Sequence, residues 1–187
     1  MLPTDFSRAV LLLISLALGG CGLVQTVGDG TTSTAKAVFY KQVKTLRLDF
    51  TGRASLNTDS AEMNALSVAT LVRIYQLRDS RAFEQASYDQ MVTAAASALS
   101  ADLVDEQAVV IKPGGGAQLS VPLHSEARYV AVVALYRQPD LEQNSWRLLV
   151  PRDELHPDRA RIVELADNTL FLAEAARNKK QHASVED

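Results

Sequence analysis

Short runs of alternating apolar and polar residues, separated by turn residues, constrain this chain more than any other feature of its sequence. In residues 45–51, Leu46, Leu48 and Phe50 alternate with polar residues, which is the period of two of a half-buried strand. Further strand-like runs occupy 69–77, 108–112, 117–123, 128–137, 145–151, 159–165 and 169–173. Most connections are short and contain turn residues. The pattern predicts an all-β fold, a two-sheet antiparallel β-sandwich of about eight strands.

Two of these runs carry more detailed expectations. Residues 128–136 are apolar on both faces, so we place them in the middle of a sheet. The glycines at 114–116 lie between two strands and are not followed by the Lys-Ser or Lys-Thr pair of a phosphate-binding loop. We therefore interpret 113–116 as a hairpin turn.

One segment between the second and third strands departs from the strand pattern. Its apolar residues recur at helical spacing and form one stripe, namely Tyr88, Met91, Val92, Ala95 and Leu99. Ser87 and Gln90 have the spacing of a capping box, and the alanines at 94–96 favour a helix. The sequence thus predicts one inserted α-helix of about three turns, packed by one face on the sandwich.

The N-terminal segment has the features of an export signal. Residues 9–18 are almost entirely apolar, but ten helical residues rise only about 15 Å, half of the hydrocarbon core of a bilayer. The following Leu18-Gly19-Gly20-Cys21 resembles a bacterial lipobox, which implies cleavage before Cys21 and lipidation of its sulfur and amine. Residue 22 is Gly and not the Asp that resembles an inner-membrane retention signal. We therefore expect a lipid-anchored protein of the outer membrane that faces the periplasm.

These features divide the chain into four parts. We expect a signal peptide at 1–20, a lipidated Cys21 with a flexible Gly- and Thr-rich tether at 21–36, a sandwich domain at 37–174 and a polar tail at 175–187. Because the chain has a single Cys, no internal disulfide is possible. We expect the sandwich domain to fold alone as a monomer, without a metal or a disulfide.

Composition and motifs argue against several functions. The 19 Lys and Arg and 22 Asp and Glu give a net charge of −3, whereas nucleic-acid binders usually have a basic excess. Neither GxSxG nor HExxH occurs. His124, Ser125 and Glu126 share a predicted turn, where sequence neighbours rarely meet as a triad. We interpret His124 and His156 as surface residues and Trp146 as a packing residue, and we expect no cofactor, metal or small-molecule substrate.

Several motifs, taken in their order along the chain, resemble the outer-membrane lipoprotein family of type VI secretion systems called TssJ, also VasD or SciN. They are the lipobox, Leu56–Asp59, Val72–Leu77, Pro113–Gly115, Arg128–Ala134 with Tyr136 and Arg137, and Trp146–Arg147. The resemblance covers about 45–173. It implies a transthyretin-like sandwich with an added helix and no enzymatic activity. It also implies an anchor that binds the periplasmic C-terminal domain of the inner-membrane protein TssM and ties the trans-envelope complex to the outer membrane.

The resemblance further implies that the partner contact lies on the loop between the first two strands, here 53–68. A loop of this length is uncommon and often functional. Leu56 and Leu66 can either pack on the sandwich or face a partner, and Met63 suits an anchoring contact because its thioether is flexible. Side chains of Asn57 and Asp59 can hold the loop in one shape. The candidate partner-binding residues are Asn57, Asp59, Ala61, Glu62, Met63 and Asn64.

Two other classes of protein use similar scaffolds. One is a periplasmic transthyretin-like hydrolase, but such hydrolases carry a Tyr-Arg-Gly-Ser ending and clustered His, and this chain has neither. The other is a ligand-binding lipoprotein unrelated to secretion, for example one that binds carbohydrate. It would need several exposed aromatic residues on one strand face, and aromatic residues make up only 6% of the chain.

Overall fold

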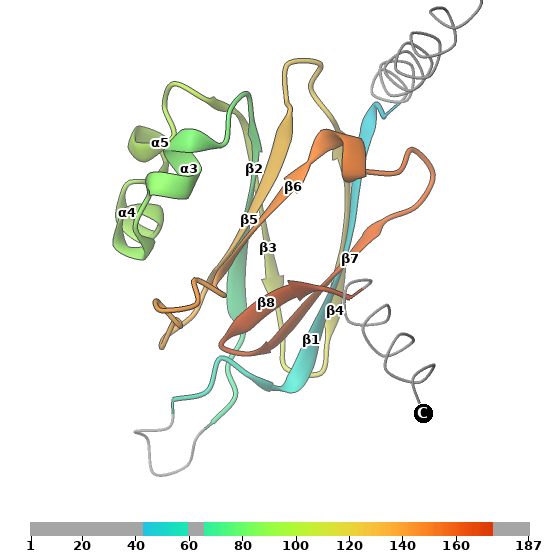
Figure 1. The fold of residues 1–187 in the computed structure, drawn as a ribbon. Coiled ribbons are helices and arrows are strands. Elements are labelled where there is room, and N and C mark those ends of the chain that lie inside the picture. The colour runs from blue at the N-terminus through green and yellow to red at the C-terminus, as the bar shows by residue number, and fades with distance from the viewer. Residues whose placement is uncertain (1–42, 60–65, 174–187) are drawn as a thin grey trace, which may run out of the picture. The chain divides into compact units, whose positions relative to one another are not determined.

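The computed structural model describes residues 43–59 and 66–173, which form a two-sheet β-sandwich with helices on one side (Figure 1). Its elements are β1 (Thr45–Leu56), β2 (Thr70–Leu77), α3 (Arg81–Gln85), α4 (Tyr88–Thr93), α5 (Ala95–Ala98), β3 (Leu103–Ile111), β4 (Gly116–Pro122), β5 (Tyr129–Leu135), β6 (Arg147–Pro151), the 3₁₀ turn η1 (Arg152–Glu154), β7 (Arg161–Asp167) and β8 (Thr169–Leu172). The first sheet has the order β4-β1-β7-β8 and the second β3-β2-β5-β6. The expected fold class is confirmed.

One strand pair departs from the expected antiparallel arrangement. Strands β1 and β7 pair in parallel, with Leu48 opposite Arg161 and Leu56 opposite Asp167. The other strand pairs of the described residues are antiparallel. Because β1 and β7 lie more than a hundred residues apart, no short turn dictates their relative direction.

The core lies between the sheets and continues outward under the helices. Strand β1 contributes Leu46, Leu48 and Phe50 to the core, as their alternation predicts. Strand β5 is buried at each of its five central residues, and it lies between β2 and β6. The expectation that this run is a central strand is confirmed. Trp146 is 1% exposed, which confirms its packing role.

The inserted helical segment is not a single helix, and this expectation is wrong. Helices α3, α4 and α5 are separate short pieces, and the chain turns between α4 and α5 at Ala94 (φ −144°, ψ 33°). Met91, Ala95 and Leu99 are nevertheless all buried. In a straight helix, residues four apart rotate by about 40° per step, so breaks let short pieces keep their apolar residues on the sheet. The capping box of Ser87 and Gln90 is present at the start of α4.

Arg147 of β6 attaches the helices to the second sheet. Its guanidinium lies over the rings of Phe83 and Trp146, at 5.6 and 4.9 Å from their centroids. It also donates hydrogen bonds to the carbonyl oxygens of Phe83 (2.9 Å), Glu84 (3.2 Å) and Ala86 (3.1 Å) at the end of α3. These carbonyls lack partners within such a short helix, so the arginine serves as its C-terminal cap.

The glycine-rich turn at 113–116 is not a hairpin, because β3 and β4 belong to different sheets. It crosses from one sheet to the other and packs on the second half of β1. There the amide of Gly52 donates to the carbonyl of Gly115 (2.8 Å), and the amide of Gly114 donates to the carbonyl of Arg53 (3.1 Å). By contrast, β7 and β8 do form the antiparallel hairpin suggested by Asp167 and Asn168.

The connection between the first two strands is shorter than expected. Strand β1 continues through Arg53 to Leu56, past a register shift after Gly52, so the loop begins at Asn57. Leu56 is fully buried, whereas Leu66 is 61% exposed. Cys21, the tether, the polar tail and residues 60–65 lie outside the described residues. No helix among the described residues is long and apolar enough to cross a membrane.

Candidate partner-binding site

The two ends of the sandwich differ in the connections that they carry. Connections β1–β2, β3–β4, β5–β6 and β7–β8 gather at one end, which we call the loop end. Val43, where the described chain starts, lies at the opposite end with the β4–β5 and β6–β7 connections, and we call this the entry end (Figure 1). Strand β1 joins the two ends, and twelve residues at about 3.3 Å each make them roughly 36 Å apart.

Asn57 holds the start of the β1–β2 loop. Its backbone is in the left-handed region (φ 53°), and the residue is 2% exposed. Its amide donates to the carbonyl of Asp167 (2.7 Å), and its side-chain oxygen accepts from the amide of Arg137 (2.7 Å). Asn tolerates the left-handed region better than most residues. The structure therefore places this candidate inside the protein, as a residue that positions the loop.

Further contacts at the base of the loop hold both of its ends. The carboxylate of Asp59 lies 3.5 Å from the guanidinium of Arg137, and the side chain of Asp59 is only 15% exposed. The hydroxyl of Thr58 donates to the carboxylate of Asp167. On the returning side, the amide of Val68 donates to the carbonyl of Leu56 (3.1 Å). Of the other candidates, Ala61, Glu62, Met63 and Asn64 lie outside the described residues.

The neighbouring β5–β6 connection is built as a turn. The carboxylate of Asp140 accepts the amides of Glu142 (3.0 Å) and Gln143 (2.9 Å). Asn144 has a positive φ of 52°, which closes the connection before β6. Between these fixed points, Leu141 is 59% exposed. The turn thus presents an apolar side chain from a constrained backbone.

Tyr136 links the loop end to the helices. Its hydroxyl donates to the carbonyl of Thr169 (2.7 Å) in the β7–β8 hairpin. Its own carbonyl accepts from the hydroxyl of Tyr88 in α4. Burial, chiefly, raises the pKa of Tyr136, with smaller contributions from Asp167 and Tyr88, and burial raises the pKa of Tyr88 to about 12. Both phenols are therefore neutral donors at physiological pH.

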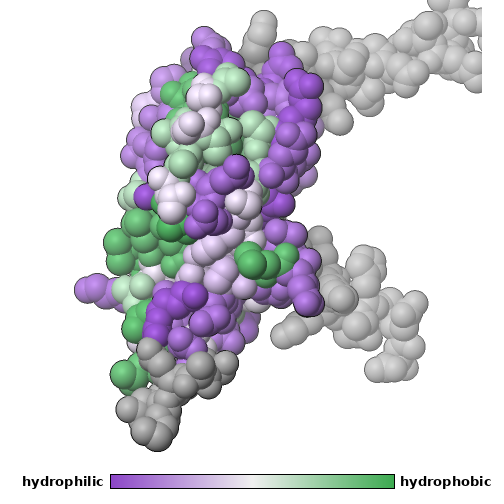
Figure 2. All heavy atoms as spheres, turned by 90° about the vertical axis from the view of Figure 1, so that its left-hand side faces the viewer, coloured by the Kyte–Doolittle hydropathy of each residue, from purple (hydrophilic) through white to green (hydrophobic). Residues whose placement is uncertain are grey.

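The side of the molecule that carries the helices is mostly hydrophilic, with separate apolar patches (Figure 2). One such patch lies low in this view, close to the grey residues of the β1–β2 loop. Large apolar side chains that are exposed in the described part are Leu66, Val92, Val110 and Leu141. Two of these four belong to connections of the loop end, Leu66 to β1–β2 and Leu141 to β5–β6. Exposed apolar residues at one end favour a protein contact there.

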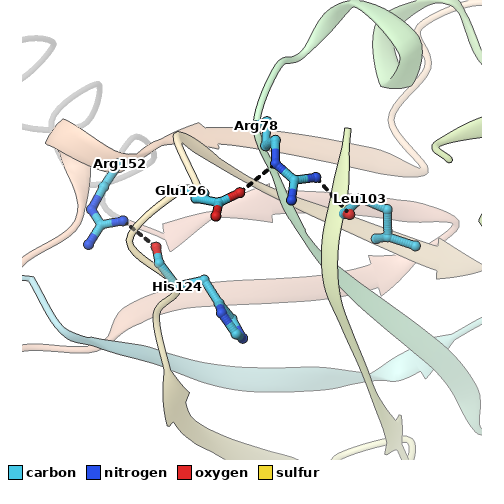
Figure 3. A network of polar contacts seen from close by, with 5 residues as sticks. All are labelled: Arg78, Leu103, His124, Glu126 and Arg152. Carbon is cyan, nitrogen blue, oxygen red and sulfur yellow. Dashed lines mark hydrogen bonds and ion pairs between the residues drawn. The ribbon is translucent and has the colours of Figure 1, made fainter. Parts of the chain in front are cut away.

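A network of buried and exposed arginines stabilises the entry end (Figure 3). The guanidinium of Arg152, which is 5% exposed as a residue, donates to the carbonyls of His124 (2.6 Å), Ala127 (2.8 Å) and Val43 (2.7 Å). It thereby fixes the start of the sandwich to the β4–β5 connection. Nearby, Gln76 is 1% exposed and bonds Pro122 and His124 across the sheets.

The entry end also has an open pocket of about 530 Å³, lined by Arg78, Asp79, Asp102, Ser125, Glu126 and Arg128. Small-molecule sites are mostly apolar, whereas this lining is polar and charged. Arg78 pairs with Glu126 at 2.7 Å, and Arg81 donates to the Asp79 carboxylate, which lowers the pKa of Asp79. The pocket charges thus largely satisfy one another.

The residues His124, Ser125 and Glu126 do not assemble as a catalytic triad. Figure 3 shows the His124 ring pointing away from the Glu126 carboxylate, which is instead bonded to Arg78. His124 is exposed, as the sequence predicts for a turn residue. A serine nucleophile needs a histidine within hydrogen-bond reach that a third group orients, and this arrangement offers no such histidine.

Sequence reasoning from spacing alone missed Arg137, Arg152 and Gln76. All three are polar residues whose partners are distant in sequence, so no local pattern marks their role. Arg137 did occur among the motifs that carry the family resemblance. Its position directly after a buried central strand was the signal that could have found it.

Fold and site together define a small β-sandwich protein built for protein contact at its loop end. The chain belongs to a known family, because the family model described as type VI secretion lipoprotein, VasD, EvfM, TssJ matches residues 44–173. No curated protein matches the chain. The recognition of this family from the sequence is confirmed, and with it the secretion-lipoprotein class.

Solved structures agree with this assignment. A chain of a structure described as "Type VI membrane complex" is 38% identical, with a TM-score of 0.65, and the match covers 70% of this chain and 98% of that one. A chain of a structure of the T6SS protein TssM C-terminal domain from EAEC is 36% identical, with a TM-score of 0.63 and the same coverage. The lipoprotein TssJ1 from Pseudomonas aeruginosa is 23% identical (TM-score 0.58; 70% and 95% covered) and shares the fold.

Proposed function

We propose that this protein anchors the trans-envelope complex of a type VI secretion system to the outer membrane by binding the periplasmic C-terminal domain of TssM. The family assignment and the similarity to chains from a type VI membrane complex and from a TssM structure support this function. The observation that carries it is geometric. The chain enters the sandwich at Val43, and the candidate contact lies at the other end of β1.

The lipid attachment is proposed from the sequence. Cys21 is lipidated, the chain before it is removed, and residues 21–36 tether the sandwich of 37–174 to the inner leaflet of the outer membrane. Two or more acyl chains anchor a protein stably. Gly22 supports sorting to the outer membrane, with the sandwich facing the periplasm. The loop end can then face away from that membrane, toward a partner that rises from the inner one.

The proposed partner contact consists of Asp59, Ala61, Glu62, Met63 and Asn64, with Met63 as its apolar anchor. Asn57 serves this contact by holding the loop in place, since its side chain is buried and bonded to Arg137. A loop that is fixed at its base loses less conformational entropy on binding than a free one. This preorganisation supports the β1–β2 loop as a recognition element.

The position of β1 suits an anchor under tension. It lies inside the first sheet, between β4 and β7, and connects the entry end directly to the β1–β2 loop. A pull between lipid and partner therefore runs along one covalent backbone. Arg152 holds the entry side of this strand through the carbonyl of Val43.

The proposed role is not enzymatic. The polar pocket of the entry end and the separated His124 and Glu126 support no acyl-transfer or hydrolytic site within the described residues. The alternatives of a transthyretin-like hydrolase and a ligand-binding lipoprotein have no observation in their favour.

Two experiments test the function. Cys21→Ser should release the protein from the outer-membrane fraction after a high-salt wash, and continued sedimentation with that fraction would refute the lipid anchor. Replacing 58–65 by a Gly-Ser link should abolish binding of the TssM periplasmic domain in calorimetry, with the melting midpoint nearly unchanged. Unchanged affinity in this folded variant would place the interface elsewhere.

A further inference from the structure

We propose that the TssM-binding surface extends from the β1–β2 loop onto the β5–β6 connection, residues 136–146, with Leu141 as a second apolar contact. This inference rests on the proposed function and names the part of the surface that the sequence motifs did not indicate. Three properties of the connection carry it: its attachment to the loop, its fixed shape, and its chemistry.

The β5–β6 connection is attached directly to the base of the β1–β2 loop. The amide of Arg137 donates to the buried side chain of Asn57 at 2.7 Å, and the guanidinium of Arg137 lies 3.5 Å from Asp59. One residue of the connection therefore bonds two residues of the loop, through its backbone and its side chain. A partner that covers Asp59 also lies next to Arg137 and the turn that follows.

The connection is held in one conformation without help from a partner. Asp140 accepts two backbone amides within the turn, from Glu142 and Gln143, and Asn144 takes the left-handed conformation that ends it. Tyr136 fixes the other end through Thr169 and Tyr88. Contacts made by such a preformed turn cost little ordering on binding.

Leu141 is the apolar feature of this turn, since 59% of it is exposed although the backbone around it is fixed. Leu66, on the returning side of the β1–β2 loop, is 61% exposed. The flanking carboxylates of Asp140 and Glu142 give the turn two negative charges. The fitting partner surface is thus an apolar hollow with basic or amide groups at its rim, continuous with the site for Met63.

The experiment compares single substitutions in the full lipidated chain, purified in detergent, by calorimetry against the TssM periplasmic domain. Leu141→Ala should weaken binding at least tenfold, and Leu141→Met should retain binding within about threefold because it conserves apolar volume. The matched control is Val110→Ala on β3, because Val110 is 57% exposed and lies on a strand and not on this connection. This control should bind within twofold of the wild type.

Other results would overturn the inference. Leu141→Ala that binds like the wild type places Leu141 outside the interface, and equal losses for Leu141→Ala and Val110→Ala show that the effect is not specific to the turn. A wild-type dimer in light scattering that Leu141→Ala dissociates, with TssM binding unchanged, identifies a second copy as the occupant. If the wild type itself fails to bind, the proposed function fails and this extension falls with it. Melting midpoints equal to that of the wild type confirm that each variant is folded.

Discussion

The side-chain oxygen of Asn57 accepts a hydrogen bond from the backbone amide of Arg137, eighty residues further along the chain, at 2.7 Å. This bond joins the end of β1 to the end of β5, which belong to different sheets. Because Asn57 is buried and has a positive φ, the bond fixes both the loop direction and the start of the neighbouring turn. The loop end is therefore one unit made of sequence-distant pieces.

Asn57→Ala should destabilise the protein by about 2–4 kcal/mol. The change leaves the buried amide of Arg137 without its acceptor, and it puts a Cβ-bearing residue without a capping side chain into the left-handed region. Asn57→Gly is the control, since glycine keeps the conformation and loses only the side-chain bond, so its cost should be smaller. Urea unfolding measures both. A midpoint of Asn57→Ala equal to that of the wild type would show that the bond is dispensable.

Arg152→Ala should cost roughly 2–4 kcal/mol, because it removes the donor for three carbonyls, those of His124, Ala127 and Val43, at a buried site. Amide hydrogen exchange near Val43 should accelerate as the start of the sandwich loosens. The control is Arg78→Ala, which removes an exposed ion pair with Glu126 and should cost less than about 1 kcal/mol. Equal effects of the two substitutions would contradict the structural role of Arg152.

Gly52→Ala should destabilise the sandwich by about 1–3 kcal/mol through overpacking. A Cβ on Gly52 would lie 2.7 Å from the Cγ2 of Ile111 and 2.8 Å from the carbonyl oxygen of Lys112, and the latter is backbone that cannot easily move. Gly114→Asn is the control, because nothing lies within 4 Å of its Cβ position and Asn tolerates its φ of 68°. Thermal melts compare the two, and equal midpoints would refute the close contact.

Stability should fall with rising pH above about 10, the ordinary pKa of tyrosine. Burial raises the folded-state pKa of Tyr75, Tyr88 and Tyr136 above that value, to about 12 for Tyr88. The folded state thus favours the neutral phenol, so its stabilising contribution is complete below pH 10 and is lost as the pH rises toward 12.

Ultraviolet titration of the folded protein should therefore show that these three of the five tyrosines ionise late. Tyr88→Phe should reduce the alkaline loss of stability. Full ionisation of all five near pH 10, with the protein still folded, would contradict the burial of these phenols.

The sequence by itself determined the elements that depend on local patterns. Alternation in 45–51 marked a half-buried strand, and the two apolar faces of 128–136 marked a central one, because side chains on a strand point alternately to opposite faces. The Ser87 capping box marked a true helix start, since that motif is closed within four residues. Motif order along the chain also sufficed to recognise the family.

Only the tertiary structure decided which elements meet. The parallel pairing of β1 with β7 and the passage of 113–116 between sheets link strands whose direction no local turn encodes. The break at Ala94 arises because packing of Met91, Ala95 and Leu99 on the sheet outweighs the helix propensity of an alanine run. Likewise Asn57 reads in the sequence as a loop residue, but Arg137 and Asp167, which lie far along the chain, make it a buried bond acceptor and donor. Burial and long-range hydrogen bonds are properties of the whole fold, which is why they set the shape of the loop end and its sequence alone did not.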